Sequence, residues 1–147
     1  MDFDKTDYAV LNALISNSRL SLRKLAKAAD VSVATAMNRL KALEKNGVIK
    51  KYSAQLDYDK LNFDLQAVIL LKVSKGKLFD VEGKIASHPN VCAVFDITGQ
   101  YDALVLAKFK SRQLMDKFLK KIQTYDFIER TETSIILNTI KDEQVKV

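Results

Sequence analysis

The spacing of apolar residues changes about one third of the way along this chain of 147 residues. Up to residue 47 the apolar side chains recur every three or four positions, which is the period of an amphipathic helix. From residue 65 onward, alternating or continuous apolar runs typical of strands are interleaved with helical segments. The change predicts an α-helical unit followed by an α+β unit.

Three short helices are predicted in the first unit, and each begins with a residue that favours the N-cap position. The turn before the third helix contains Asp30, which tolerates the left-handed conformation that a tight turn often needs. Gly47 ends the third helix. The caps are Asp4, Ser21 and Ser32, and the inward residues of the third helix are Val33, Ala36, Met37, Leu40 and Leu43. This arrangement is typical of a helix-turn-helix motif.

Positive charge is concentrated in this first unit. The whole chain has a formal net charge of +6, and residues 19–51 hold nine Lys or Arg against two Asp or Glu. Such asymmetry favours a polyanion-binding segment, and the alternative is a solvated, lysine-rich surface. The outer face of the third helix is polar and basic and carries Ala34, Thr35, Asn38, Arg39, Lys41 and Lys45.

A helix of this kind fits the major groove of DNA, where its outward side chains meet base edges. Asn pairs with adenine and Arg with guanine, so Asn38 and Arg39 are the expected base-reading residues. Ser32, Ala34 and Thr35 lie at the start of the same helix. The expected phosphate contacts, which supply affinity without sequence information, are Arg23, Lys24, Lys41, Lys45, Lys50 and Lys51. The β-prone segment 48–56 is expected to form a wing or a linker strand.

The second unit is predicted to contain strands over 65–73, 91–98, 103–109 and 128–140, with helices marked by Leu78 to Ile85 and by Leu114 to Ile122. The order βαββαβ is that of a ferredoxin-like fold, so the fold class is α+β. The expected domains are a helix-turn-helix domain over 1–52, a linker strand or hinge over 53–62 and a ferredoxin-like domain over 63–147.

Both faces of the predicted sheet are apolar, whereas two helices can cover only one. One face is expected to carry Ala67, Ile69, Leu71, Ala93, Phe95, Ile97, Val105 and Ala107, and the other Val68, Leu70, Cys92, Val94, Leu104, Leu106, Ile135 and Leu137. A large exposed apolar patch is unusual on a monomer. A second copy, packed sheet against sheet, is the simplest cover. The alternative is that the N-terminal unit covers this face.

Enzymatic chemistry has little support in the sequence. The only histidine, His88, and the only cysteine, Cys92, cannot build a structural zinc site. No phosphate-cradling glycine motif and no nucleophile elbow are present. Cys92 lies in an apolar strand and is expected to be a packed, inert thiol. No enzyme, metal or cofactor is therefore expected. A lone cysteine, no apolar leader and no membrane-length apolar run favour a cytoplasmic protein.

The turn from Gly99 to Asp102 joins two apolar strands and combines a flexible backbone, an aromatic ring and a carboxylate. These groups suit a small zwitterion held by its ammonium end, although such turns are also common structural elements. The expected effector-binding residues are Thr98, Gly99, Gln100, Tyr101, Asp102, Thr133 and Ser134.

The sequence resembles the Lrp/AsnC (feast/famine) family along nearly its whole length. The resemblance rests on the opening segment 4–7, on Leu25 and Ala26, on the segments 39–44 and 47–49, on Gly99 and Asp102 as the family's G-x-x-D, and on the segment 130–133. It implies a transcription regulator with an N-terminal DNA-binding domain and a C-terminal RAM domain. It also implies dimers through the RAM sheets, often octamers, and amino-acid sensing between dimers.

Two positions depart from the family pattern. Asp30 stands where a turn glycine is common, and Asn38 replaces a frequent basic residue. The alternative function is a chromatin-like protein that coats DNA with little sequence specificity and no effector.

Overall fold

The computed structural model describes residues 2–147, without the side chains of Val81 and Glu82. The chain divides into two compact units. Unit 1 comprises the residues up to Gln55 together with Lys141–Val147, and unit 2 comprises Leu56–Ile140. The second domain was expected to run to residue 147, but the segment 141–147 belongs with unit 1. Among the described residues, no helix has the length and apolar character needed to span a membrane.

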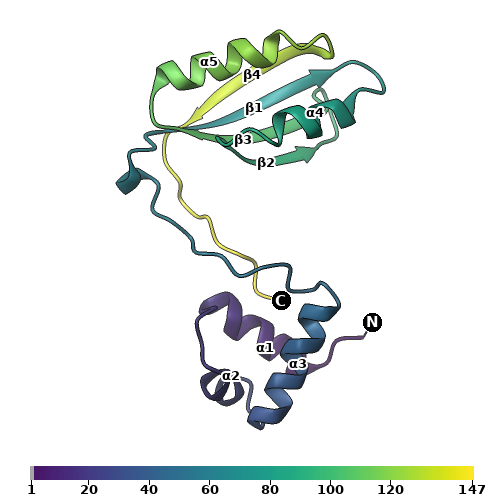
Figure 1. Ribbon diagram of the computed structural model, residues 1–147, viewed down its shortest axis with the longest axis vertical. Coiled ribbons are helices and arrows are strands. Elements are labelled where there is room, and N and C mark those ends of the chain that lie inside the picture. The colour runs from purple at the N-terminus through teal and green to yellow at the C-terminus, as the bar shows by residue number, and fades with distance from the viewer. Residues whose placement is uncertain (1) are drawn as a thin grey trace. The chain divides into compact units, whose positions relative to one another are not determined.

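Unit 1 is built from helices α1 (Lys5–Ser16), α2 (Leu22–Ala28) and α3 (Val33–Lys45) (Figure 1). The three predicted caps are confirmed. The Asp4 carboxylate accepts hydrogen bonds from the backbone N–H groups of Thr6 and Asp7, and the Asp7 carboxylate accepts one from the Asp4 N–H, which completes a capping box. The hydroxyls of Ser21 and Ser32 cap α2 and α3.

The two tight connections in unit 1 have the predicted backbone conformations. Asp30 has φ 53° before α3, and Gly47 has φ 70° after it. Val10, Leu25, Ala29 and Leu43 form the buried core. Val33 was expected to face this core but is 44% exposed. It is the first residue of α3, and the buried residues of that helix lie one to three turns further on.

The segment 48–56 forms neither the expected wing nor a linker strand within this chain. A β-prone segment needs a partner strand, and the described part of unit 1 contains no strand. The segment is instead tied by side chains. The Tyr52 hydroxyl donates to Glu44 Oε1 at 2.8 Å, and the Gln55 amide donates to the Asp142 carbonyl at 2.5 Å. Asn12 on α1 exchanges two hydrogen bonds with the backbone of Val147.

Unit 2 is one antiparallel sheet with the strand order β2-β3-β1-β4. After a short 3-10 turn, Asp59–Leu61, its elements are β1 (Leu65–Val73), α4 (Leu78–Ile85), β2 (Val91–Asp96), β3 (Ala103–Phe109), α5 (Arg112–Gln123) and β4 (Ile128–Ile136). This order confirms the ferredoxin-like arrangement. β1 and β3 have the predicted bounds, whereas β2 and β4 end earlier than expected.

Helices α4 and α5 pack on the same face of the sheet (Figure 1). The residues of β1 and β3 alternate between buried and half-buried along both strands. The buried set, which includes Ile69, Leu71, Val105 and Phe109, contacts Ile85 and Phe118 of the two helices. We call the opposite side of the sheet the open face. It carries Val68, Leu70, Leu104 and Leu106, which are half-buried.

An irregularity in β2 changes which of its residues face the helices. The pairing shifts between Val91 and Ala93, so Val94 lies opposite Val105 and Phe95 lies opposite Leu104. Phe95 was expected on the same face as Val105, and Val94 on the same face as Leu104, and both groupings are wrong. A bulge adds one residue to a strand and inverts the alternation beyond it.

Two further assignments from the sequence are corrected by the sheet. Cys92, expected to be packed, lies at the bulge of an edge strand and is exposed. Its thiol lies 3.2 Å from the Leu106 carbonyl. Ile135 was expected beside Leu70, but it pairs with Ala67 and therefore shares the helix-covered side.

Candidate nucleic-acid interface and effector loop

Helix α3 presents one continuous exposed stripe to solvent. Ala34, Asn38, Lys41 and Lys45 are exposed and follow one another at spacings of four, three and four residues, which places them along a single line on the helix. Ala36 and Leu43 bury the opposite side of α3. The stripe therefore has the width and polarity that a helix needs to enter the major groove.

The first turn of α3 is held by its own hydroxyl groups. Ser32 Oγ accepts from the Thr35 backbone N–H at 3.1 Å and lies 2.8 Å from Thr35 Oγ1. Ser32 is exposed, whereas Thr35 is half-buried. These two hydroxyls chiefly fix the start of the helix.

Arg39 is placed differently from the expectation that it reads a base. One guanidinium nitrogen lies 2.8 Å from Asp4 Oδ2, and the other contacts both carboxylate oxygens of Asp7, at 3.3 and 3.2 Å. Asp7 is only 6% exposed. The side chain of Arg39 therefore turns away from the stripe toward the N-terminus of α1.

These contacts change the pKa of the Asp4 carboxyl. The backbone N–H of Asp7 chiefly holds the pKa of the Asp4 carboxyl below its usual value; desolvation opposes this, and the Arg39 guanidinium and the Thr6 N–H add to the lowering. Both carboxylates bind a cation and a helix N-terminus at once. Arg39 thus fastens α3 to α1, a role that helical periodicity did not reveal.

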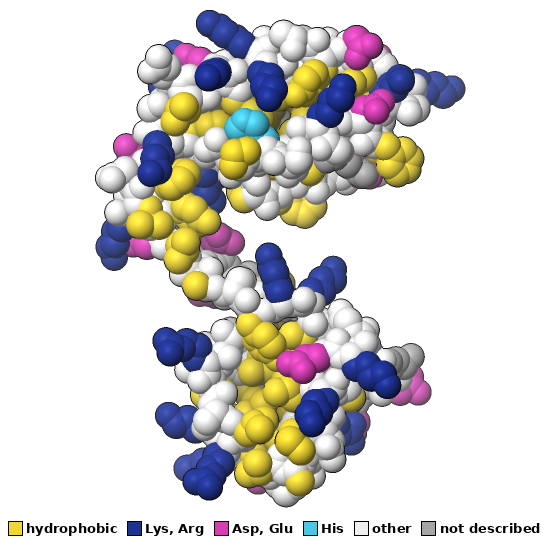
Figure 2. All heavy atoms as spheres, viewed as in Figure 1, with side chains coloured by type: hydrophobic (Ala, Val, Ile, Leu, Met, Phe, Trp, Pro, Cys, Tyr) yellow, Lys and Arg dark blue, Asp and Glu magenta, His cyan; other side chains and the backbone are white. Residues whose placement is uncertain are grey.

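The remaining basic residues expected at the interface are exposed. They are Arg23 and Lys24 on α2, Lys41 and Lys45 on α3, and Lys50 and Lys51 after it. Within the described residues, none of them has a carboxylate partner within 4.0 Å. Lys and Arg side chains outnumber acidic ones on the visible surface of unit 1, the lower body in Figure 2. Unpaired cations of this kind are free to meet phosphates.

Gly99 and Tyr101 shape the loop 98–102 of unit 2, which we call the effector loop because the sequence predicts effector binding there. Gly99 has φ 114°, a conformation that L side chains rarely adopt, and its neighbours Thr98 and Gln100 are exposed. Tyr101 is 7% exposed. Its hydroxyl donates to Glu132 Oε2 at 2.5 Å, and the Arg130 guanidinium lies 5.6 Å from the centre of its ring.

Asp102 closes this loop onto strand β1. Its carboxylate accepts the Val73 backbone N–H at 2.8 Å and binds Lys72 Nζ at 3.1 Å, while its own N–H donates to the Leu71 carbonyl. The Val73 hydrogen bond and then Lys72 lower the pKa of the Asp102 carboxyl. The side chain is 33% exposed. Part of its accepting capacity is therefore already used within the protein.

The two hydroxyl residues predicted on the last strand point to opposite faces. Thr133 lies opposite Ile69 and shares the helix-covered side, whereas Ser134 lies opposite Val68 on the open face. Only Ser134 therefore shares the face of Glu132, the partner of Tyr101.

The structure also brings Lys72, Arg130 and Glu132, which sequence reasoning missed, together with the predicted residues Tyr101 and Asp102. We call Lys72, Asp102, Arg130 and Glu132, with the ring of Tyr101, the charged corner. It contains two cationic and two anionic side chains. The sequence could have revealed part of this group, because side chains alternate along a strand and Arg130, Glu132 and Ser134 therefore share one face of the last strand.

Two family models match this chain. The Lrp/AsnC ligand binding domain matches residues 66–145, and the winged helix-turn-helix DNA-binding model matches residues 3–50. The first therefore covers more than half of the chain and includes the sheet, the loop and the charged corner. The second includes all three helices of unit 1.

Two known regulators are similar in sequence to nearly the whole chain. An uncharacterized HTH-type transcriptional regulator of Pyrococcus furiosus is 41% identical over 97% of each chain. The HTH-type transcriptional regulator FL11 of Pyrococcus horikoshii is 32% identical over 95% of this chain and 92% of its own.

Solved structures share the fold over nearly the whole chain. A transcriptional regulator of Neisseria meningitidis in complex with L-Met is 29% identical, with a TM-score of 0.87 over 97% of this chain and 94% of that one. AsnC of E. coli is 26% identical, with a TM-score of 0.89 over all of both chains. The chain is a member of the Lrp/AsnC family, with a helix-turn-helix unit at its N-terminus and the family's ligand-binding domain after it.

Proposed function

We propose that this protein is an effector-responsive transcription regulator that binds duplex DNA through α3. The observation that carries the proposal is the exposed stripe of α3, which combines a base-reading amide with cations that have no partner within the described residues. Its relatives, which are named HTH-type transcriptional regulators, support the same function.

Within this proposal, Asn38 is the principal base-reading residue, because its amide can donate to and accept from adenine at once. Ala34 offers an apolar contact one turn earlier. Lys41 and Lys45 on α3, with Arg23 and Lys24 on α2 and Lys50 and Lys51 after α3, contact phosphates. Ser32 and Thr35 act through the cap of α3. Arg39 is left out of the reading set, because Asp4 and Asp7 hold its guanidinium.

Selection of bound duplexes from random-sequence DNA tests the proposal. A few enriched sequences are expected, whereas binding without enrichment would favour the alternative of a DNA-coating protein. On the selected site, Asn38→Ala should lower discrimination at one base pair by about 1–3 kcal/mol. Asn46→Ala, at the exposed C-terminal end of α3, is the matched control. Equal discrimination by both variants would contradict the role of Asn38.

The protein is further proposed to form a dimer through the open face. Val68, Leu70, Leu104 and Leu106 give this face an apolar centre, and Phe95 beside them is 52% exposed. Covering one branched or aromatic side chain fully is worth about 1.5–3 kcal/mol. A second copy with the same face supplies that cover under two-fold symmetry. Pairing of such dimers, up to an octamer, would bring several effector loops together.

The proposed effector is an amino acid bound beside Gly99, Tyr101 and Asp102. Gly99 allows close approach of the backbone, and the charged corner offers carboxylates for an ammonium group and cations for a carboxylate. The related regulator from Neisseria meningitidis is described in complex with L-Met, which supports an effector of this class. Ser134 lies on the face of this corner, whereas Thr133 does not.

Calorimetry with a panel of amino acids tests the effector site. We expect binding by the wild type and weakened binding by Ser134→Ala and Asp102→Ala, with Thr133→Ala as the matched control on the opposite face. A ligand that favours one assembly should also change DNA affinity by linkage. No binding by the wild type, or equal binding by all variants, would contradict this site.

A further inference from the structure

Helix α5 carries an unusual concentration of positive charge on its outer face. Met115, Phe118 and Ile122 bury one side of the helix against the sheet. The exposed side carries four cationic residues and a single acidic residue, Asp116. The cations are Arg112, Lys117, Lys120 and Lys121. We call these four residues the α5 basic face.

The cations of this face form no ion pair with any carboxylate that the structure describes. No described carboxylate lies within 4.0 Å of any of their nitrogen atoms, although Asp116 is on the same helix. By contrast, Lys60, Lys72 and Lys77 of the same unit all form ion pairs. The pKa of His88 is lowered by burial and, second, by the positive charge of Lys121. The face therefore presents a positive potential that no described carboxylate neutralises within 4.0 Å.

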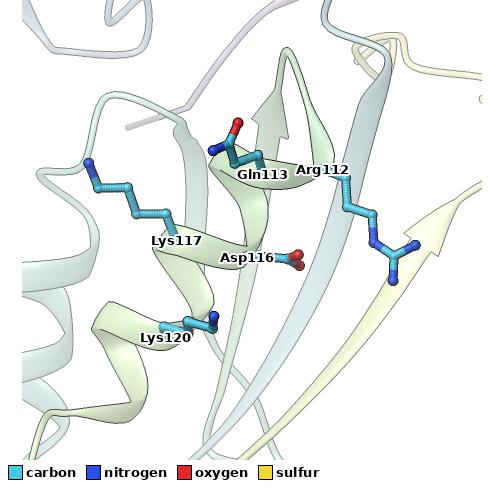
Figure 3. Close-up of a pocket in the computed structure, with 5 residues that line it drawn as sticks. All are labelled: Arg112, Gln113, Asp116, Lys117 and Lys120. Atoms are coloured by element: carbon cyan, nitrogen blue, oxygen red, sulfur yellow. The ribbon is translucent and has the colours of Figure 1, made fainter.

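The shape of the surface fits an extended anion better than a small one. Arg112, Gln113, Asp116, Lys117 and Lys120 line a shallow hollow of about 550 Å³. Figure 3 shows Lys117 and Arg112 extending away from each other, with Asp116 between them. Side chains that spread apart cannot enclose a small ligand. Basic side chains are also spread over the visible surface of unit 2, the upper body in Figure 2.

We propose that the α5 basic face is a second, sequence-independent DNA contact that binds the phosphate backbone. This proposal rests on the proposed function, because unit 1 brings the duplex to the protein. A helix of 12 residues is about 18 Å long. Phosphates rise about 3.4 Å each along one strand, so the face spans roughly five of them. Charge complementarity and length thus both favour a nucleic-acid backbone.

The salt dependence of binding tests this proposal directly. The probe is random-sequence duplex DNA, titrated with full-length protein by fluorescence anisotropy at several salt concentrations. The variant is Lys117→Gln with Lys120→Gln. The matched control is Lys60→Gln with Lys75→Gln, which removes the same charge from exposed positions elsewhere in unit 2. Each lost phosphate contact lowers the magnitude of the slope of log affinity against log salt by about 0.9. The variant loses two such contacts in each protomer, so the magnitude of its slope should be smaller by about 1.8 per protomer.

Directed cleavage gives a second, independent readout. An iron–EDTA reagent is attached to a cysteine at position 120 (Lys120→Cys) or, as control, at position 75 (Lys75→Cys), both in a Cys92→Ser background because Cys92 is exposed. Cleavage of bound DNA is expected from position 120 and not from position 75.

The outcomes separate this proposal from the function it rests on. If the wild type binds no duplex, the proposed function fails. If the Lys117/Lys120 variant and its control have equal slopes and position 120 cuts no DNA, only the α5 contact is overturned. A variant that keeps the DNA slope but loses binding to anionic lipid vesicles would assign this face to a membrane, and would overturn the proposal as well.

Discussion

The contact between Arg39 and the two acidic residues of α1 leads to a sharp prediction about stability. In Arg39→Met the guanidinium is lost while most of the apolar stem remains. The carboxylate of Asp7, a residue that is 6% exposed, would then keep the Asp4 backbone N–H, at 3.1 Å, as its one hydrogen-bond donor among the described residues. We expect the variant to unfold more easily than the wild type and to keep its base discrimination.

The magnitude follows from burial on each side of the pair. Leaving a buried polar group without its partner costs about 1–3 kcal/mol. Arg39 is 40% exposed, so solvent screening places the expected loss in the lower part of that range, at about 1–2 kcal/mol. For a domain of the size of unit 1, such a loss of stability lowers the melting temperature by at least about 4 °C.

Urea unfolding followed by helical circular dichroism measures this loss, and a double-mutant cycle with Asp7→Asn isolates the pair. Lys41→Met is the matched control, because Lys41 lies two residues along α3 and is exposed and unpaired. It should leave stability unchanged and weaken DNA binding uniformly across sequences. The reasoning is refuted if Arg39→Met unfolds like the wild type and loses discrimination at one base pair.

Three further predictions follow from other contacts. Leu106→Asp on the open face should convert the proposed dimer to a monomer by light scattering, and an unchanged mass would exclude this face as the interface. Because the Asp102 carboxyl has a lowered pKa, its stabilising effect is present above about pH 4 and is lost as the pH falls further. Asp102→Asn should therefore have a lower melting temperature than the wild type at pH 7, and the difference between the two melting temperatures should become smaller in acid. Burial and then Glu44 raise the pKa of Tyr52 to about 12, so the stability that its phenol supplies should disappear between about pH 10 and 12. Glu44→Gln should lower the pKa of Tyr52 in an ultraviolet titration, and a shift of the same size in Asp59→Asn would point to net charge instead.

Features that depend on a few neighbouring residues could be predicted from the sequence. The caps at Asp4, Ser21 and Ser32 need only a side chain and the next helical turn. The left-handed turn at Asp30 needs only its own backbone. The order of strands and helices, and with it the fold class, also follows from local periodicity. The exposed stripe of α3 around Asn38 belongs to the same group.

The direction of Arg39 could not be predicted in this way. A long side chain at the edge of a helix face reaches either solvent or a neighbouring helix, and the choice depends on what that helix presents. Here α1 places Asp4 and Asp7 within hydrogen-bond distance, in a contact that spans more than thirty residues of sequence. Only the packing of α3 on α1 decided that Arg39 contacts Asp4 and Asp7.

The faces of the sheet were likewise decided by the tertiary structure. Alternation assigns a side chain to a face by counting, and one extra residue inverts the count for everything beyond it. The bulge in β2 therefore moved Phe95 to the open face and exposed Cys92. Pairing of β4 with β1 placed Ser134 on the open face and Glu132 against Tyr101. The sequence determined which elements form, because their hydrogen bonds and periodicity are local, and the tertiary structure alone decided which side chains meet across them.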